Sequence, residues 1–430
     1  MTRYFSTILL LAAAPLFILA QPPAPAPAQQ QPVYIYGATA HLGDGRVIEN
    51  CAIAFDKGKI TLVGEADKQP ERDLRTYRQI DATGKHVYPG FIAPANNLGL
   101  VEIGAVRATR DYREVGSMNP NIRSLIAYNT DSEVIPTVRS QGVLLSQVRP
   151  EGGRISGLSS VVQLDAWNWE DAAYRADDGL FLNWPQLASF SRREQGVATN
   201  KEYDKQVQEI RDFFTEAKAY LENPKPEQAN LKFEALRPVF EGKVRLYIEA
   251  QEAREIIHAV QLAGEFGLKL AIVDGREAWM VANMLKDNAV AVVLRETHSL
   301  PARVDSDVDQ PFKTPAILAD AGVLFCFSID GFWQQRNLAF QAGQAVGYGL
   351  SYEQAVAALT SNTAKILGID DRTGALDVGK DANLFISEGD ALDVRSSKVV
   401  NAFIQGREIN LDNKQKALYR KFKAKYDEGR

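Results

Sequence analysis

Histidine is the side chain that most often binds a catalytic metal, and this chain has only four histidines. His41 lies in a Gly-Asp turn region, His86 precedes a Pro-Gly pair, and His258 lies within the helical pattern EIIHAVQLAGEF. His298 follows an apolar run and is the one histidine placed to face a pocket, with an ordinary loop position as the alternative. A hydrolytic zinc centre takes about three His or carboxylate ligands and one open position. The histidines alone therefore do not assemble such a centre.

The body of the chain, from Pro89 to about Leu367, alternates apolar runs with amphipathic stretches. This alternation predicts a parallel sheet with covering helices, in which the residues that follow each strand meet at one edge. The predicted strands are Val143–Val148, Val244–Ile248, Leu268–Val273, Val290–Leu294 and Val323–Phe327. The predicted helices include Asp204–Leu221, Ala253–Phe266 and Tyr352–Leu367.

Two long segments rich in Arg, Asp, Asn and Gly, residues 106–143 and 149–172, lie in the first half of this body. In a barrel, segments that follow strands form the rim of the pocket, and we expect both to do so. The second begins with RPEGGRISG, which by itself is a glycine-rich turn. The chain has no P-loop, dinucleotide fingerprint or Gly-x-Ser-x-Gly elbow.

Two stretches carry a family resemblance. VYPGFIAPANNLGL, residues 87–100, resembles the first barrel strand of the amidohydrolase superfamily, in particular its imidazolonepropionase-like branch. GLSYEQAVAALTSNTAKILGIDDRTGALDVGKDANL, residues 349–384, follows the C-terminal frame of that family nearly throughout. The resemblance runs from about Tyr34 to Leu411. It implies an α/β fold, a (β/α)8 TIM-like barrel, with a small split β-sandwich built from both ends of the chain.

The resemblance also implies a divalent metal, usually zinc, at the strand ends, and this chain departs from the family there. The first strand has Ala93, Ala95 and Asn97 where the family has Asp, His and His. The column for a bridging carboxylate or lysine falls near Leu182. The positions that correspond to metal ligands or their pocket are Ala95, Asn97, Glu249, Gln251, Asp274 and Asp330, and only Asp330 clearly keeps the family residue.

The replacements leave a polar, acidic set of side chains. Glu249, Asp274 and Asp330 would bring three carboxylates to one face, and these are the candidate catalytic residues. Carboxylates suit a hard cation such as Ca²⁺ or Mg²⁺, a cationic ligand, or acid/base work by a pair with a raised pKa. A vestigial polar pocket is the fourth interpretation, and the sequence leaves all four open.

We therefore expect an exported amidohydrolase-like protein whose metal site is lost and which needs no cofactor. Its expected role is non-catalytic, as a ligand-binding protein or as the partner subunit of an intact amidohydrolase; a homo-oligomer is the other assembly considered. The alternative is an active hydrolase of carbon–nitrogen bonds in small amides or cyclic imides, working through a reduced or metal-free carboxylate site. Function resides in the site rather than in the fold, so the resemblance alone does not decide between them.

The first residues read as a targeting segment. Arg3 is followed by the uncharged apolar run Phe5–Ala20, which is typical of a cleaved signal peptide and of a periplasmic or secreted protein; a retained anchor is the alternative. The expected organisation is a signal peptide at 1–20, an extended Pro/Ala/Gln linker at 21–32, a composite sheet domain at 33–88 with 368–412, a barrel at 89–367 and a basic helix at 413–430.

The last segment, NKQKALYRKFKAKYDEGR, repeats an apolar side chain every four residues at Leu418, Phe422 and Tyr426. We expect this helix to pack on the sheet domain with a solvated basic face; docking to a partner is the alternative. The whole chain has a formal net charge of -5, with Lys+Arg 49 against Asp+Glu 54. That balance gives no reason to expect nucleic acid or an anionic membrane as the main partner, and no membrane span is expected after signal removal.

Overall fold

The computed structural model describes residues 24–69, 73–191, 196–223, 228–301, 303 and 305–427. The predicted signal peptide, residues 1–20, lies outside them. The described part of the linker, from residue 24, has no helix or strand before Val33. It is nevertheless attached to the body, because Ala26 N–H donates to Asp165 and Arg407 donates to the Ala26 carbonyl.

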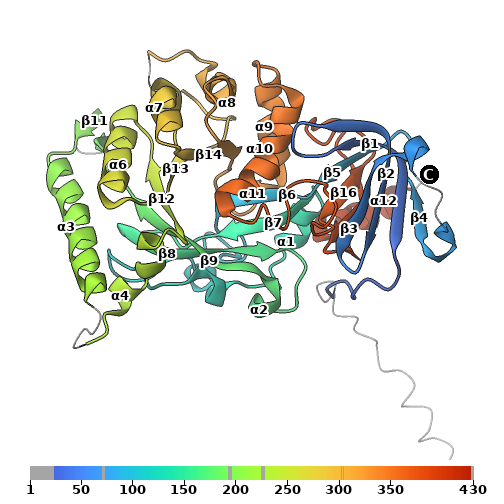
Figure 1. Ribbon diagram of the computed structural model, residues 1–430, viewed down its shortest axis with the longest axis horizontal. Coiled ribbons are helices and arrows are strands. Elements are labelled where there is room, and N and C mark those ends of the chain that lie inside the picture. The colour runs from blue at the N-terminus through green and yellow to red at the C-terminus, as the bar shows by residue number, and fades with distance from the viewer. Residues whose placement is uncertain are drawn as a thin grey trace, which may run out of the picture.

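A sheet at one end of the molecule is formed by both ends of the chain (Figure 1). Strand β16 pairs antiparallel with β5 on one side and with β17 on the other, which joins the two ends directly. The expected composite sheet domain is therefore confirmed, as one hydrogen-bonded sheet in the order β18-β17-β16-β5-β1-β2-β3, with β4 beside β1. Its strands are β1 (Val33–His41), β2 (Val47–Asp56), β3 (Lys59–Glu65), β4 (Arg78–Asp81), β5 (His86–Pro89), β16 (Leu384–Ser387), β17 (Val399–Ile404) and β18 (Arg407–Glu408).

The second sheet is a nearly closed barrel with the strand order β15-β14-β13-β12-β9-β8-β7-β6, in agreement with the expected fold class. Inward-facing side chains, among them Ile92, Phe181 and Tyr247, fill its interior. The strands are β6 (Phe91–Asn96), β7 (Val143–Val148), β8 (Ile155–Gln163), β9 (Ala173–Asn183), β12 (Arg245–Ala250), β13 (Leu270–Asp274), β14 (Ala291–Leu294) and β15 (Phe325–Phe327). A separate hairpin consists of β10 (Ala188–Ser191) and β11 (Gly196–Thr199).

One strand departs from the expected parallel alternation. Strand β8 pairs antiparallel with both β7 and β9, and all its residues are buried. The expectation that residues 149–172 form a rim loop was therefore wrong for Ile155–Gln163. The run ISGLSSVVQ looks loop-like because it is rich in Ser and Gly. In the barrel its hydroxyls find partners, for example Ser159 Oγ with Asp178 and Ser160 Oγ with the Asp177 backbone N–H.

Helices cover the outside of the barrel (Figure 1). They are α1 (Ile135–Arg139), α2 (Trp169–Ala172), α3 (Tyr203–Glu222), α4 (Leu231–Glu234), α5 (Arg237–Phe240), α6 (Ala253–Phe266), α7 (Ala282–Asp287), α8 (Gln310–Asp320), α9 (Leu338–Val346), α10 (Tyr352–Leu359) and α11 (Ser361–Leu367). Helix α12 (Lys414–Asp427) lies toward the sheet-domain end instead. The single helix predicted at Tyr352–Leu367 is two helices. Thr360 breaks it with a non-helical backbone, and its hydroxyl donates to Val356 while Gly43 of the sheet domain approaches closely.

The chain crosses between the two sheets at Gly90. Strand β5 ends at Pro89 in the sheet domain and β6 begins at Phe91 in the barrel, so the stretch 87–100 belongs to both. The Gly90 N–H donates to the Asn383 carbonyl, and a Cβ at Gly90 would lie 2.7 Å from a Leu144 methyl carbon. A side chain at this crossing would therefore separate the two sheets.

The C-terminal helix α12 does not pack as expected. None of its residues is buried, and Leu418, Phe422 and Tyr426 are 43%, 51% and 69% exposed. Its first turn is held to the barrel side, where Thr137 Oγ1 donates to Gln415 and Asn413 donates to Ser140 Oγ. Across the described residues, no helix has both the length and the apolar character needed to cross a membrane.

Candidate functional site: an arginine-centred barrel mouth

The three predicted carboxylates meet at one rim of the barrel. Glu249 lies near the end of β12, Asp274 is the last residue of β13, and Asp330 follows β15 by three residues. These strands run parallel, so their carboxyl ends lie on the same side. Asp274 is almost completely buried at 1% exposure, whereas the side chain of Asp330 is 59% exposed.

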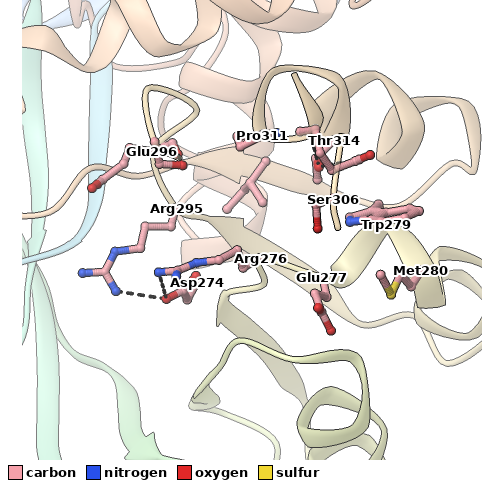
Figure 2. Close-up of a pocket in the computed structure, with 13 residues that line it drawn as sticks. Asp274, Arg276, Glu277, Trp279, Met280, Arg295, Glu296, Ser306, Pro311 and Thr314 are labelled. Carbon is pink, nitrogen blue, oxygen red and sulfur yellow. Dashed lines mark hydrogen bonds and ion pairs between the residues drawn. The ribbon is translucent and has the colours of Figure 1, made fainter. Parts of the chain in front are cut away.

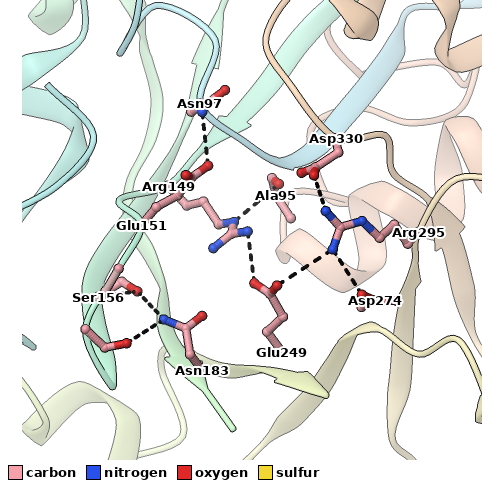
Figure 3. A network of polar contacts seen from close by, with 12 residues as sticks. Ala95, Asn97, Arg149, Glu151, Ser156, Asn183, Glu249, Asp274, Arg295 and Asp330 are labelled. Atoms are coloured by element: carbon pink, nitrogen blue, oxygen red, sulfur yellow. Dashed lines mark hydrogen bonds and ion pairs between the residues drawn. The ribbon is translucent and has the colours of Figure 1, made fainter. Parts of the chain in front are cut away.

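A guanidinium lies between these carboxylates (Figure 3). Arg295 directly follows β14, and its Nη1 lies 3.0 Å from Asp274 Oδ2 and 3.8 Å from Glu249 Oε1. Its Nη2 pairs with Asp330 Oδ2. Burial alone would lower the pKa of Arg295, but the nearby carboxylates outweigh it and hold the pKa above its usual value. Arg295 is therefore charged, and the three acidic positions share its one positive charge.

A second guanidinium completes the network. Arg149 follows β7, is buried, and donates from Nη2 to Glu249 Oε2 at 3.0 Å. Its Nε donates to the Ala95 carbonyl at 3.3 Å, and the cation stacks over the Phe181 ring at 5.0 Å. Ala95 has a left-handed backbone with φ of 51°, which turns its peptide groups into the mouth, and its N–H donates to Gln147.

Asn97 lies at the edge of this network. Its Nδ2 donates to Glu151 Oε1 at 3.0 Å, and its own Oδ1 is buried without a partner among the described residues (Figure 3). Burial raises the pKa of Glu151, and the Asp330 and Glu249 carboxylates add to that effect, while Arg149 opposes it. Glu151 is thus a second, partly buried acid beside the ion-pair network.

The remaining predicted positions do not join the network. Gln251 lines a neighbouring hollow with Glu249 and Arg154, and its backbone N–H donates to Glu255. His298 is bonded through Nδ1 to the amide of Gln341, 2.9 Å away. Leu182 is fully buried within β9.

A buried acid also lies deeper in the barrel. Asp178 on β9 accepts from Ser159 Oγ at 2.9 Å and from Gln147 Nε2 at 2.7 Å. Burial raises its pKa to about 6, although both hydrogen bonds oppose the rise. Because Gln147 also accepts from the Ala95 N–H, this acid is linked by hydrogen bonds to the mouth.

A pocket opens beside Asp274, between the loops after β13 and β14 (Figure 2). Asp274, Arg276 and Arg295 lie at one end, and Trp279 and Met280 lie at the other. Asp274 Oδ1 is buried and has no hydrogen-bond partner among the described residues. Burial raises the pKa of Asp274, while Arg276 and Arg295 oppose the rise. The pocket thus combines an unused acceptor, cationic side chains and an apolar wall.

Arg149 and Arg295 are the site residues that the sequence analysis missed. Each stands directly after an apolar run that was predicted as a strand, Val143–Val148 and Val290–Leu294. An arginine at the carboxyl end of a buried parallel strand was the available signal, because such positions face the mouth of a barrel. Arginine is not a metal ligand, so a metal-ligand pattern of His and carboxylates does not include these cations.

Comparison with known proteins agrees with this architecture. Residues 212–409 match the amidohydrolase family model. The crystal structure of an amidohydrolase from Thermotoga maritima MSB8 is similar over 87% of this chain and 99% of that one, with a TM-score of 0.76 and 26% sequence identity. The chain is thus similar to the amidohydrolase family in sequence over residues 212–409 and to an amidohydrolase structure in fold over most of its length. Comparison with curated protein sequences gave no significant match.

More distant amidohydrolase structures share the fold alone. Molinate hydrolase is 16% identical, with a TM-score of 0.55 over 89% of this chain and 95% of that one. An adenosine deaminase from Xanthomonas campestris, solved with bound zinc, is 15% identical, with a TM-score of 0.54 over 95% of this chain and 99% of that one. At these identities the similarity carries no information about the reaction of this chain.

Proposed function

We propose that this amidohydrolase-like protein is non-catalytic and binds a small ligand at the barrel mouth. One observation carries the proposal: the Arg295 guanidinium contacts Glu249, Asp274 and Asp330 at once. A guanidinium is a permanent cation with fixed donors and no acceptor. It supplies the positive charge that a metal would bring, but it has no site at which to activate water.

The catalytic metal implied by the fold does not fit the residues present. Zinc takes about three ligands from His, Cys or carboxylate, and Ala95 has no donor side chain while the Asn97 amide is bonded to Glu151. The carboxylates form an oxygen-only set, already paired with Arg149 and Arg295. Among the described residues, no group of three His, Cys, Asp or Glu side chains is arranged to hold an ion. A divalent ion would have to displace a guanidinium that remains charged nearby.

The pocket beside Asp274 suggests what kind of ligand is bound. Burying an acceptor without a partner costs free energy, so Asp274 Oδ1 favours a ligand that brings an N–H donor. Arg276, whose side chain is 38% exposed, lies 3.6 Å from Asp274 and has donors left for an acceptor on the same ligand. Trp279 and Met280 would cover an apolar group.

A partner-subunit role is the second candidate. Val115, Leu300 and Val308 are 88%, 85% and 70% exposed, on the long loops that follow β6 and β14 at the rim. A contiguous patch of exposed apolar side chains favours a protein interface, and these three lie on loops that follow parallel strands at the same rim. Pairing with an intact amidohydrolase through this rim would bury them.

Elemental analysis of the purified mature protein tests the proposal. We expect less than one equivalent of Zn²⁺, Mn²⁺, Fe²⁺ or Co²⁺ per chain and no hydrolysis of small amides or cyclic imides. Stoichiometric transition metal, lost together with an amidase activity in Asp330→Ala, would instead establish the hydrolase of carbon–nitrogen bonds. Asp305→Ala, an exposed acid outside the mouth, is the matched control.

We further propose that the protein is exported and belongs to the imidazolonepropionase-like branch. The order of Arg3, an apolar run and the small residue Ala20 supports cleavage after Ala20. The frame shared by residues 87–100 and 349–384 supports the branch. The intact mass of protein taken from its native envelope checks export, because a mass that includes residues 1–20 would rule out cleavage.

A further inference from the structure

Helix α12 is an amphipathic helix that the rest of the protein leaves uncovered. It is 14 residues long, and every residue after Lys416 is exposed. Leu418, Tyr419, Phe422 and Tyr426 recur at spacings of three and four and so share one face. These four are 43%, 66%, 51% and 69% exposed. The helix therefore presents an apolar, mostly aromatic stripe to solvent.

Cations border this stripe on both sides. At 3.6 residues per turn, Lys414, Lys421 and Lys425 fall along one edge of the stripe, and Lys416 and Lys423 fall along the other. Lys421 Nζ lies 5.9 Å from the Phe422 ring centroid, and Lys425 Nζ lies 5.9 Å from that of Tyr426. The only acid within the helix is Asp427, at its end. The helix is strongly basic, although the whole chain carries a net charge of -5.

The first turn fixes the helix to the body and leaves the stripe free. Asn413 caps it by accepting from the Lys416 N–H at 2.8 Å, and Arg420 pairs with Asp412 at 2.6 Å. Gln415 and Asn413 bond to Thr137 and Ser140 beside α1. Gln415 lies at the N-terminal end of the same face as the stripe, so the attachment uses that end and leaves the four apolar side chains beyond it exposed.

We propose that α12 lies in the surface of an anionic lipid bilayer and holds the protein there peripherally. Charge complementarity identifies the surface that covers the stripe. An apolar stripe with lysines along both edges matches a bilayer, which is apolar within and anionic at its headgroups. The lysine stems reach along the bilayer surface and place their ammonium groups among the phosphates. Tyr419 and Tyr426 suit the same boundary, because each ring is apolar and each hydroxyl remains wet.

Self-association fits the same stripe less well. Two copies packed stripe to stripe would bring their lysine rows together at the edges of the contact, where paired helices need opposite charges. An acidic protein groove would have to supply carboxylates along both edges of a 14-residue helix. A bilayer presents anionic headgroups to the lysines along both edges of the helix, and it does so wherever the helix lies on the surface.

Vesicle cosedimentation of the full mature protein tests the proposal. We expect binding to vesicles made of equal parts phosphatidylglycerol and phosphatidylcholine. We expect at least tenfold weaker binding to pure phosphatidylcholine, because the contacts of about five lysines with anionic headgroups are lost. High salt should release the protein, since exposed charges are screened beyond roughly 3 Å at 1 M.

Two matched variants separate the stripe from the helix itself. Leu418→Ser with Phe422→Ser removes the apolar anchors and should reduce binding at least tenfold. Ala417→Ser with Ala424→Ser makes the same kind of change on the other face and should bind as the unaltered protein does. Both should melt at the same temperature as the parent, because none of the four side chains is buried.

Equal binding to anionic and neutral vesicles, or unchanged binding by the stripe variant, would overturn the proposal. A dimer that dissociates when Leu418 and Phe422 are replaced would also overturn it, because a second copy of the chain would then cover the stripe. Stoichiometric capture of an acidic protein by the helix, without binding to anionic vesicles, would also overturn it.

Discussion

The Arg295 guanidinium donates to Asp274 Oδ2 at 3.0 Å inside the barrel mouth, where Asp274 is almost completely buried. This contact gives the deepest acidic side chain of the site a fixed cation. A metal ion and this guanidinium cannot both take the same carboxylate oxygens. The family fold is thus retained around a site whose positive charge belongs to the protein itself.

Histidine restoration should require the removal of arginine. We expect little zinc uptake when His replaces Ala95, Asn97, Glu249, Gln251 and Asp274 while both arginines remain. Arg149 and Arg295 would still direct positive charge at the restored ligands. Adding Arg149→Ser and Arg295→Ser should raise uptake to about one equivalent per chain, since a site needs about three ligands. Elemental analysis of both variants decides; one equivalent of zinc with the arginines in place would contradict the prediction.

Removal of Arg295 alone should destabilise the fold. Arg295→Met removes the nearer of two guanidinium partners of buried Asp274 and leaves only Arg276, 3.6 Å away, and breaking a buried pair typically costs about 3 kcal/mol or more. Adding Asp274→Asn should recover part of that loss, because it removes the buried charge. Asparagine also tolerates the left-handed backbone at this position, where φ is 74°. Urea unfolding at neutral pH measures the double-mutant cycle, and additive effects would show that the two side chains are not coupled.

Asp178 should make stability depend on pH. Its pKa in the folded protein is about 6, above the ordinary value of 3.8, because it is buried. The folded state therefore holds a proton that the unfolded state releases. That stabilisation is complete below about pH 4 and is lost as pH rises through about 6. The variant Asp178→Asn cannot titrate at this position and lacks this stabilisation. The free energy of unfolding of the variant minus that of the parent should therefore rise by roughly 3 kcal/mol between acidic and mildly alkaline pH.

The control for that measurement is Asp177→Asn. Asp177 is the next residue on the same strand, but it is partly exposed and pairs with Arg123. Denaturant unfolding across the same pH range gives both curves. A difference between Asp178→Asn and the parent that stays constant with pH would show that Asp178 does not titrate in this range.

Because the composite sheet contains strands from both ends of the chain, the segment after Ile369 should be required for folding. A chain that ends at Ile369 loses β16, β17 and β18, which exposes the edge of β5 and the aromatic contact of Tyr88 with Phe385. We expect an insoluble or molten product. A chain that ends at Asn413 removes only α12, which has no buried residue, and should fold. A soluble barrel with a cooperative melt from the shorter chain would show that the two sheets are independent.

Local sequence was sufficient where an element carries its own signals. Helix α6 has the predicted bounds, Ala253–Phe266, because Glu252 and Glu255 form a capping box and Gly267 ends it in a left-handed conformation. Strand β7 likewise has the predicted bounds. The family frame, which extends across both ends of the chain, was sufficient to predict the composite sheet.

The tertiary structure decided what depends on distant partners. Strand β8 is buried because β7 and β9 satisfy its polar groups, and Thr360 breaks a helix where Gly43 approaches. The sequence by itself determined that the chain has only four histidines and that acids lie at the ends of the predicted strands. Only closure of the barrel placed Arg149 and Arg295 among those acids. Ion pairing depends on distance in space, and residues as far apart as Arg149 and Glu249 meet only when strand ends converge on one rim.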